Sequence, residues 1–103
     1  MDQGCIRHMV IFSLKHGQGS SAAQEFLQDA EEKLSGIASV EEFTVFDQIS
    51  AKNDYDYGFS MDFKDQDAYD TYNAHPTHVA FVEQRWKKEV EKFLEIDFQR
   101  REA

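Results

Sequence analysis

Four short segments of the chain carry the apolar spacing that is typical of β-strands. They span residues 6–14, 40–49, 57–63 and 94–98. β-Branched and aromatic residues dominate these segments, and turn-forming residues follow the first two. In residues 57–63, aromatic residues and methionine alternate strictly with small or polar ones, so this strand has one apolar face. Residues 6–14 are apolar on both faces at the middle of the segment, and both faces therefore need cover.

Between these strands, apolar residues recur at helical spacing in two regions. Ser20 can cap the first helix, whose opposite face is acidic and suited to solvent. The second region starts near Asp65 and is interrupted at His75, because a residue that precedes proline is driven out of helical geometry. Pro76 suits the first turn of a new helix. We expect that helix to carry an apolar stripe of Val79, Val82, Trp86, Val90 and Phe93.

The predicted order of elements is βαββαβ, which indicates an α+β protein with a ferredoxin-like fold and helices over one face of the sheet. On the second strand we expect Phe43, Val45 and Ile49 to share a face. The chain shows no linker, internal repeat or low-complexity tract. At 103 residues it has the size of one domain, so we expect residues 1–103 to form a single unit.

Charge and composition narrow the possible partners and the compartment. The chain has 20 acidic and 11 basic residues, a net charge of −9, which disfavours nucleic acid and anionic membranes as partners. Its longest apolar run, residues 9–12, is far too short to span a bilayer. Cys5 is the single cysteine, and no secretory signal pattern opens the chain, so we expect a cytoplasmic location. An aromatic content of 14% is a large apolar load for a thin core.

Three sequence features resemble functional motifs but do not satisfy their requirements. Gly17 and Gly19 mimic part of a dinucleotide-binding loop, yet the second and third strands look antiparallel and the acidic charge disfavours a pyrophosphate. A cluster of aspartates lacks the glycine and glutamate of a calcium-binding loop. Cys5 has no helix N-terminus nearby in sequence to lower its pKa. We therefore expect no cofactor and no metal ion.

A fourth feature is suited to proton transfer. Tyr72, His75 and His78 flank Pro76, and they would meet His8 if the helix break folds over the first strand. Histidine titrates near neutrality and can take a proton from carbon, while a tyrosine hydroxyl can stabilise the developing oxyanion. The alternative is structural, with the histidines holding the break. Zinc is less attractive because this pair of histidines has no obvious third ligand.

The strand from His8 to Lys15, the segment from Tyr72 to Phe81 and the closing pair Asp97 and Phe98 together resemble the stress-responsive A/B barrel (Dabb) family. The resemblance covers essentially the whole chain. Its most specific part is the His-Pro-x-His-Val motif after a tyrosine, at this distance from the His-x-Val-x-Phe strand.

The resemblance implies a dimeric α/β barrel, in which two ferredoxin-like protomers pack sheet against sheet. Each protomer would keep a pocket between its own sheet and helices. Met9, Ile11 and Phe46 would then face the partner of the homodimer. His8 would face the pocket together with four further residues, namely Val10, Phe12, His75 and Trp86.

The family resemblance also implies candidate catalytic residues. Plant olivetolic acid cyclase, a family member, closes a linear polyketide by an intramolecular aldol step without a cofactor. By similarity, His78 would be the general base, Tyr72 the hydroxyl donor and His8 a supporting residue. Three functions remain open: a stress-associated homodimer that binds a small hydrophobic ligand, a polyketide cyclase-like acid/base enzyme, and a cofactor-free monooxygenase of a similarly folded dimeric barrel type.

Overall fold

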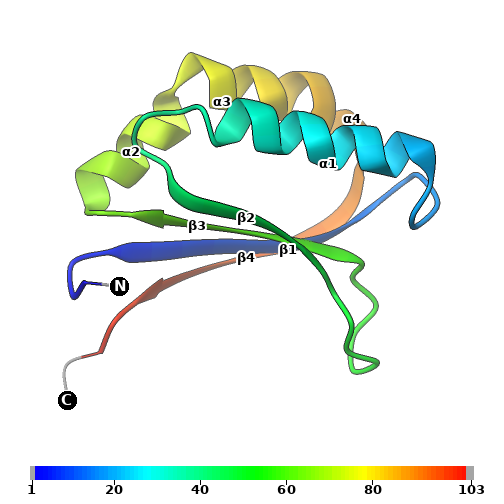
Figure 1. The fold of residues 1–103 in the computed structure, drawn as a ribbon, viewed down its shortest axis with the longest axis horizontal. Coiled ribbons are helices and arrows are strands. Elements are labelled where there is room, and N and C mark those ends of the chain that lie inside the picture. The colour runs from blue at the N-terminus through cyan, green and yellow to red at the C-terminus, as the bar shows by residue number, and fades with distance from the viewer. Residues whose placement is uncertain (1, 102–103) are drawn as a thin grey trace.

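A four-stranded antiparallel sheet with all helices on one face forms the structure, a computed structural model that describes residues 2–101 (Figure 1). The sheet order is β2-β3-β1-β4, which places β1 at the centre. The elements follow one another as β1 (Ile6–Leu14), α1 (Ser21–Leu34), β2 (Glu41–Asp47), β3 (Tyr57–Phe63), α2 (Gln66–Ala74), α3 (Pro76–Phe81), a π-helical turn η1 (Val82–Trp86), α4 (Lys87–Glu89) and β4 (Val90–Gln99). The predicted ferredoxin-like βαββαβ fold is confirmed.

Local capping chemistry sets where the helices begin. The Ser20 side chain accepts a hydrogen bond from the Ala23 amide, and Asp65 does the same for Ala68 at the start of α2. The connection into α1 is compact because Gly19 adopts a positive φ of 74°. At His75 the backbone is extended, and Pro76 opens α3 as predicted. Proline thus divides the second helical region into separately directed pieces.

The core lies between the sheet and the helices and is centred on Phe12. This ring is fully buried, and it contacts four aromatic rings, those of Phe26, Tyr57, Phe59 and Trp86. Every second residue of β1 belongs to the same face: His8, Val10 and Phe12 are all buried under the helices. The aromatic load noted in the sequence is therefore concentrated on the helix-covered face of the sheet.

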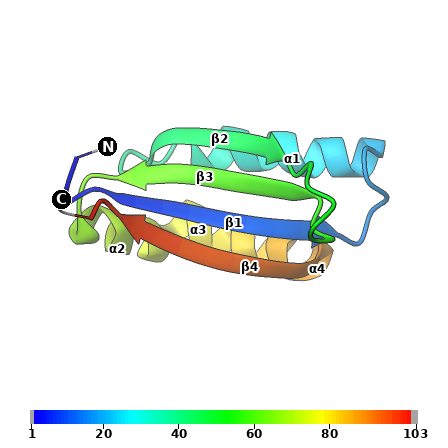
Figure 2. The same ribbon diagram turned by 90° about the horizontal axis from the view of Figure 1, so that it is seen from below.

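The other face of the sheet, which we call the outer sheet face, has no covering element in residues 2–101 (Figure 2). On β4 its side chains lie in register with those of β1, pairing Met9 with Ile96 and Ile11 with Leu94. Leu94 and Ile96 are 48% and 40% exposed. The apolar members of this face are Met9, Ile11, Phe46, Leu94, Ile96 and Phe98.

Two sequence-based boundaries were wrong. β2 ends at Asp47, so Ile49 lies in the following loop and is 93% exposed instead of sharing a face with Val45. The last strand starts at Val90, not at residue 94, and Val90 and Phe93 therefore belong to the sheet and not to a helical stripe. The cause is tertiary pairing, since β1 is nine residues long and draws this segment into register along its whole length.

No helix within residues 2–101 has the length and apolar character needed to cross a membrane.

We expect Phe12→Ala to lower the free energy of unfolding by about 3–5 kcal/mol, because it removes a ring at the centre of the core. Ile49→Ala is the control, with a change of no more than about 0.5 kcal/mol at an exposed site. Urea denaturation followed by circular dichroism measures both. Equal losses for the two variants would contradict the placement of these side chains.

Candidate functional site

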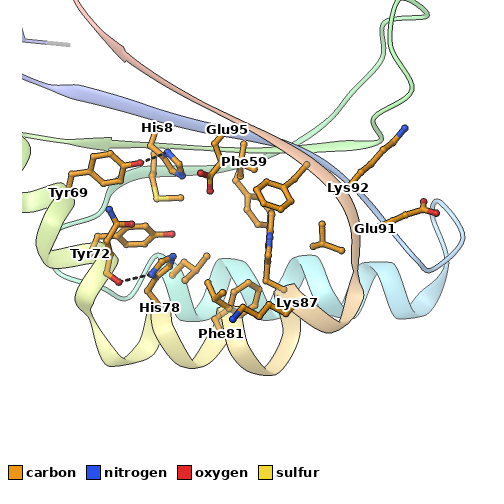
Figure 3. Close-up of a pocket in the computed structure, with 18 residues that line it drawn as sticks. His8, Phe59, Tyr69, Tyr72, His78, Phe81, Lys87, Glu91, Lys92 and Glu95 are labelled. Atoms are coloured by element: carbon orange, nitrogen blue, oxygen red, sulfur yellow. Dashed lines mark hydrogen bonds between the residues drawn. The ribbon is translucent and has the colours of Figure 1, made fainter.

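A cavity of about 740 Å³ lies between the helix-covered face of the sheet and the helical segments from α2 to α4 (Figure 3). β1 and β4 supply one wall, through residues that include His8 and Glu95, and the helical side supplies Tyr72, His78 and Trp86. Polar side chains collect where α2 and α3 approach the sheet. The remaining wall is mostly aromatic and aliphatic, as is typical of sites for small organic molecules.

The structure brings together most of the residues that the sequence proposed. His8, Tyr72 and His78 line one cavity, and so do Val10 and Trp86.

Phe12 and His75, also expected in the pocket, lie outside its lining and correct that expectation. Phe12 is fully covered by Trp86, Phe26 and the aromatic rings of β3. His75 caps α3, where its Nδ1 accepts a hydrogen bond from the Thr77 amide at 3.1 Å. Sharing a strand face or a motif with a pocket residue thus does not place a side chain in the pocket.

The proline break fixes the protonation pattern of His78. In an uninterrupted helix, the Asn73 carbonyl would accept a hydrogen bond from the amide of Thr77, four residues further along the chain. That amide is bonded to His75 instead, and the Asn73 carbonyl lies 3.2 Å from Nδ1 of His78. Because a carbonyl can only accept, Nδ1 of His78 must carry the proton. Nε2 of the neutral ring is then a free base, and burial lowers the pKa of His78, which keeps the ring neutral at pH 7.

Tyr72 lies directly against His78, with ring centroids 4.2 Å apart. The tyrosine is 3% exposed, and burial raises the pKa of its hydroxyl well above the ordinary value, so it remains a proton donor. Within residues 2–101 no hydrogen-bond partner is found for this hydroxyl. A neutral base and an unused O–H donor therefore share one end of the cavity.

His8 is held by two residues that the sequence analysis did not assign to the site. Its Nδ1–H donates to a carboxylate oxygen of Asp97 at 2.6 Å, and Tyr69 donates its hydroxyl to the same carboxylate at 3.0 Å (Figure 3 draws the adjacent Tyr69–His8 contact). Burial, and then the bond to Asp97, raise the pKa of Tyr69. Like His78, His8 is thereby held with its proton on Nδ1. The β1–β4 register, which pairs His8 with Asp97, is the feature that brings them together.

The described residues outside the cavity form neither a metal site nor a reactive thiol. Among residues 2–101, no group of three or more histidine, cysteine, aspartate or glutamate side chains is placed to hold a metal ion. Cys5 is unpaired and buried, and burial raises the pKa of its thiol, which disfavours a reactive thiolate.

Fold and site together define a ferredoxin-like α+β protein with a small-molecule cavity that contains two tautomerically fixed histidines. The model of the stress responsive A/B barrel domain (Dabb) matches residues 6–100, and the chain belongs to this family. A Dabb family protein from Mesorhizobium loti with a ferredoxin-like fold is 55% identical, with a TM-score of 0.95, and the match covers 97% of this chain and 100% of that one.

More distant solved structures share the fold. A protein from Arabidopsis thaliana is 24% identical, with a TM-score of 0.82 and coverage of 95% of this chain and 97% of that one. The hydroxynitrile lyase from Passiflora edulis is 11% identical, with a TM-score of 0.84 and coverage of 99% and 98%. No curated protein matches the sequence at a significant level.

The histidine geometry predicts a specific set of tautomers. In their neutral forms, His8 and His78 should carry the proton on Nδ1, and His75, whose Nδ1 accepts the Thr77 amide, should carry it on Nε2. Two-bond ¹⁵N–¹H correlation NMR above pH 8 distinguishes these forms. His75 serves as the internal control. A neutral His78 with its proton on Nε2 would remove the proposed free base.

Proposed function

We propose that the cavity is a catalytic site for proton transfer on a small, largely apolar carbonyl compound. The observation that carries this proposal is the pairing, in one cavity, of a neutral His78 with a Tyr72 hydroxyl, where neither His78 Nε2 nor that hydroxyl has a hydrogen-bond partner among residues 2–101. A base and an oxyanion donor of this kind are what removal of a proton next to a carbonyl requires.

The proposed step uses only these side chains. His78 Nε2 takes a proton from the carbon next to the carbonyl, and the electron pair of that C–H bond moves into the carbonyl as an enolate. Tyr72 stabilises the negative oxygen with its O–H. The enolate carbon then attacks a second carbonyl, whose oxygen takes up the proton held by His78, as in an aldol closure, or the enolate regains that proton from His78 at carbon, as in an isomerisation. His8, positioned by Asp97, lies beside the same space and supports the bound molecule.

Proteins of this fold include named enzymes. One neighbour is the Passiflora edulis hydroxynitrile lyase, and another is described as SnoaB, a cofactor-independent oxygenase from Streptomyces nogalater, at 11% identity and a TM-score of 0.73. At such identities the likeness concerns the fold alone. The proposal for this chain therefore rests on its own residues.

A second candidate is a stress-associated protein that binds a small hydrophobic ligand without converting it. The hydrogen bond from His78 to Asn73 favours it, since this bond joins α2 to α3 across the break and gives His78 a structural role. The two candidates predict different outcomes for variants of His78.

Deuterium exchange at the carbon next to the carbonyl of phenylacetone, followed by NMR in D₂O, tests the catalytic proposal. We expect exchange above the buffer rate, and a loss of about 100-fold or more in His78→Gln and in Tyr72→Phe. The base acts only when neutral, so the rate should fall as pH decreases through a midpoint below 6.5, in keeping with the lowered pKa of His78.

His16→Gln is the matched control, because it removes the hydrogen bond between His16 and Glu89 at 2.8 Å, and neither residue lines the cavity. It should lower the melting temperature and leave the exchange rate unchanged. Exchange that is absent, or equal in wild type and His78→Gln, would favour the binding protein over the enzyme.

We also propose that the chain forms a homodimer through the outer sheet face. Its apolar side chains have no cover within residues 2–101, and four of them, Phe46, Leu94, Ile96 and Phe98, are 40–50% exposed. A contiguous exposed apolar surface of this kind is typical of an interaction site. Ferredoxin-like proteins from Bacteroides fragilis and Thermobifida fusca are described as dimeric, at 18% and 19% identity. A second sheet would supply the cover that a thin single-domain core lacks.

Light scattering at low micromolar concentration should give about twice the chain mass of 12.0 kDa. Ile96→Glu should shift the mass toward one chain, because it would bury an unpaired charge in the interface. Val79→Glu adds the same charge at an exposed site on α3 and should leave the dimer intact. A monomeric wild type, or equal dissociation of both variants, would refute this interface.

The remaining proposals follow from charge and cysteine content. With a net charge of −9, we propose no nucleic-acid or membrane partner, and with Cys5 unpaired we propose a cytoplasmic location.

A further inference from the structure

Glu95 places a carboxylate in the cavity, whose other walls are mostly aromatic and aliphatic, with Lys87, Glu91 and Lys92 as the further charged side chains of the lining. It lies on β4 between Phe93 and Asp97, and these three alternate residues face the helices. The register pairs Glu95 with Val10, one step along the face from His8 and Asp97. Figure 3 shows its carboxylate directed into the cavity near the His8 ring.

Within residues 2–101, Glu95 has no hydrogen bond and no ion pair. The neighbouring acid, Asp97, is fully engaged by His8 and Tyr69. The two lysines of the lining are also engaged elsewhere: Lys92 binds Asp54 at 2.6 Å, and Lys87 binds Glu83. Neither lysine of the lining therefore neutralises Glu95.

Electrostatic influence from Glu95 reaches the proposed catalytic pair. Its negative charge contributes to the raised pKa of Tyr72 and opposes the lowering of the His78 pKa by burial. This coupling agrees with the lining in placing the carboxylate in the same space as both groups. A ligand at Tyr72 and His78 would therefore feel this charge.

Three aromatic rings, those of Phe59, Trp86 and Phe93, line the same cavity as Glu95. Trp86 and Phe93 meet edge to face with centroids 5.5 Å apart, and Phe59 lies 6.3 Å from Trp86. Ring faces attract cations, and a carboxylate beside them strengthens that preference. A carboxylate ligand would instead meet an unneutralised negative charge.

We propose that Glu95 is a specificity-determining residue, which makes the cavity select small apolar molecules that carry a protonated amine over molecules of the same size that carry a carboxylate. This inference rests on the proposed function insofar as the selected molecule is the substrate, which would be an apolar carbonyl compound with an ammonium group. The ammonium would pair with Glu95 against Trp86 and Phe93, and the carbonyl would lie toward Tyr72 and His78.

Matched ligands test the inference by binding alone. 4-Phenylbutylamine and 4-phenylbutyrate differ mainly in the sign of their charge, and Trp86, the single tryptophan, reports occupancy by fluorescence. At 0.15 M salt, where charges beyond about 8 Å are screened, we expect the amine to bind about tenfold more tightly than the carboxylate. In Glu95→Gln, the two affinities should agree within about threefold.

Glu32→Gln is the control, because it changes the net charge equally on the exposed side of α1. It should keep the amine preference. A wild type without that preference, or an equal preference in Glu95→Gln, would overturn the inference. Ketone exchange without amine preference would reject this inference alone, whereas amine preference without exchange would reject the catalytic proposal and leave the selectivity in place.

Discussion

The missing amide proton of Pro76 is the constraint on which the site depends. Because this residue cannot donate, the helix cannot continue through it, and the carbonyls before it lose their usual partners. The chain satisfies these groups locally: the His75 amide bonds to the Tyr72 carbonyl, and His78 bonds to that of Asn73. The repair of one broken helix therefore orients the imidazole and sets its tautomer. The hydrogen bond of His78 to Asn73 therefore has two effects: it satisfies a backbone carbonyl at the helix break, and it leaves His78 Nε2 unprotonated.

The sheet contributes a second, independently organised set of polar groups. Residues two apart on β4 point the same way, so Glu95 and Asp97 both face the helices. Their surroundings differ, since Asp97 meets His8 and Tyr69 while Glu95 meets open cavity and aromatic rings. One carboxylate is thus used to orient a histidine, and the other stays available to a ligand. Two side chains with the same carboxylate group thus acquire different roles through one step of strand register.

Sequence periodicity was sufficient to predict the fold, because each strand and helix has a distinct spacing of apolar residues and the proline break is a local effect. The motif around Pro76, together with the family resemblance, predicted that His8, Tyr72 and His78 share one pocket, and all three line the cavity. Glu95 and Asp97 were not assigned to that site because their positions depend on how β4 aligns with β1, a non-local pairing that no spacing within β4 reveals. Phe12 was misplaced for a similar reason: alternation gives the face of a strand but not which part of that face a helix covers.

The central strand has a further consequence for how this protein can change. Even-numbered positions of β1, such as His8 and Val10, face the cavity, and odd-numbered ones, such as Met9 and Ile11, face outward. Alternate residues of one nine-residue strand therefore form two different surfaces. A substitution at one position changes one surface and leaves the other unchanged. A single insertion or deletion would exchange them, placing an imidazole outside and a methionine over the cavity. We therefore expect β1 to tolerate substitutions but not insertions or deletions.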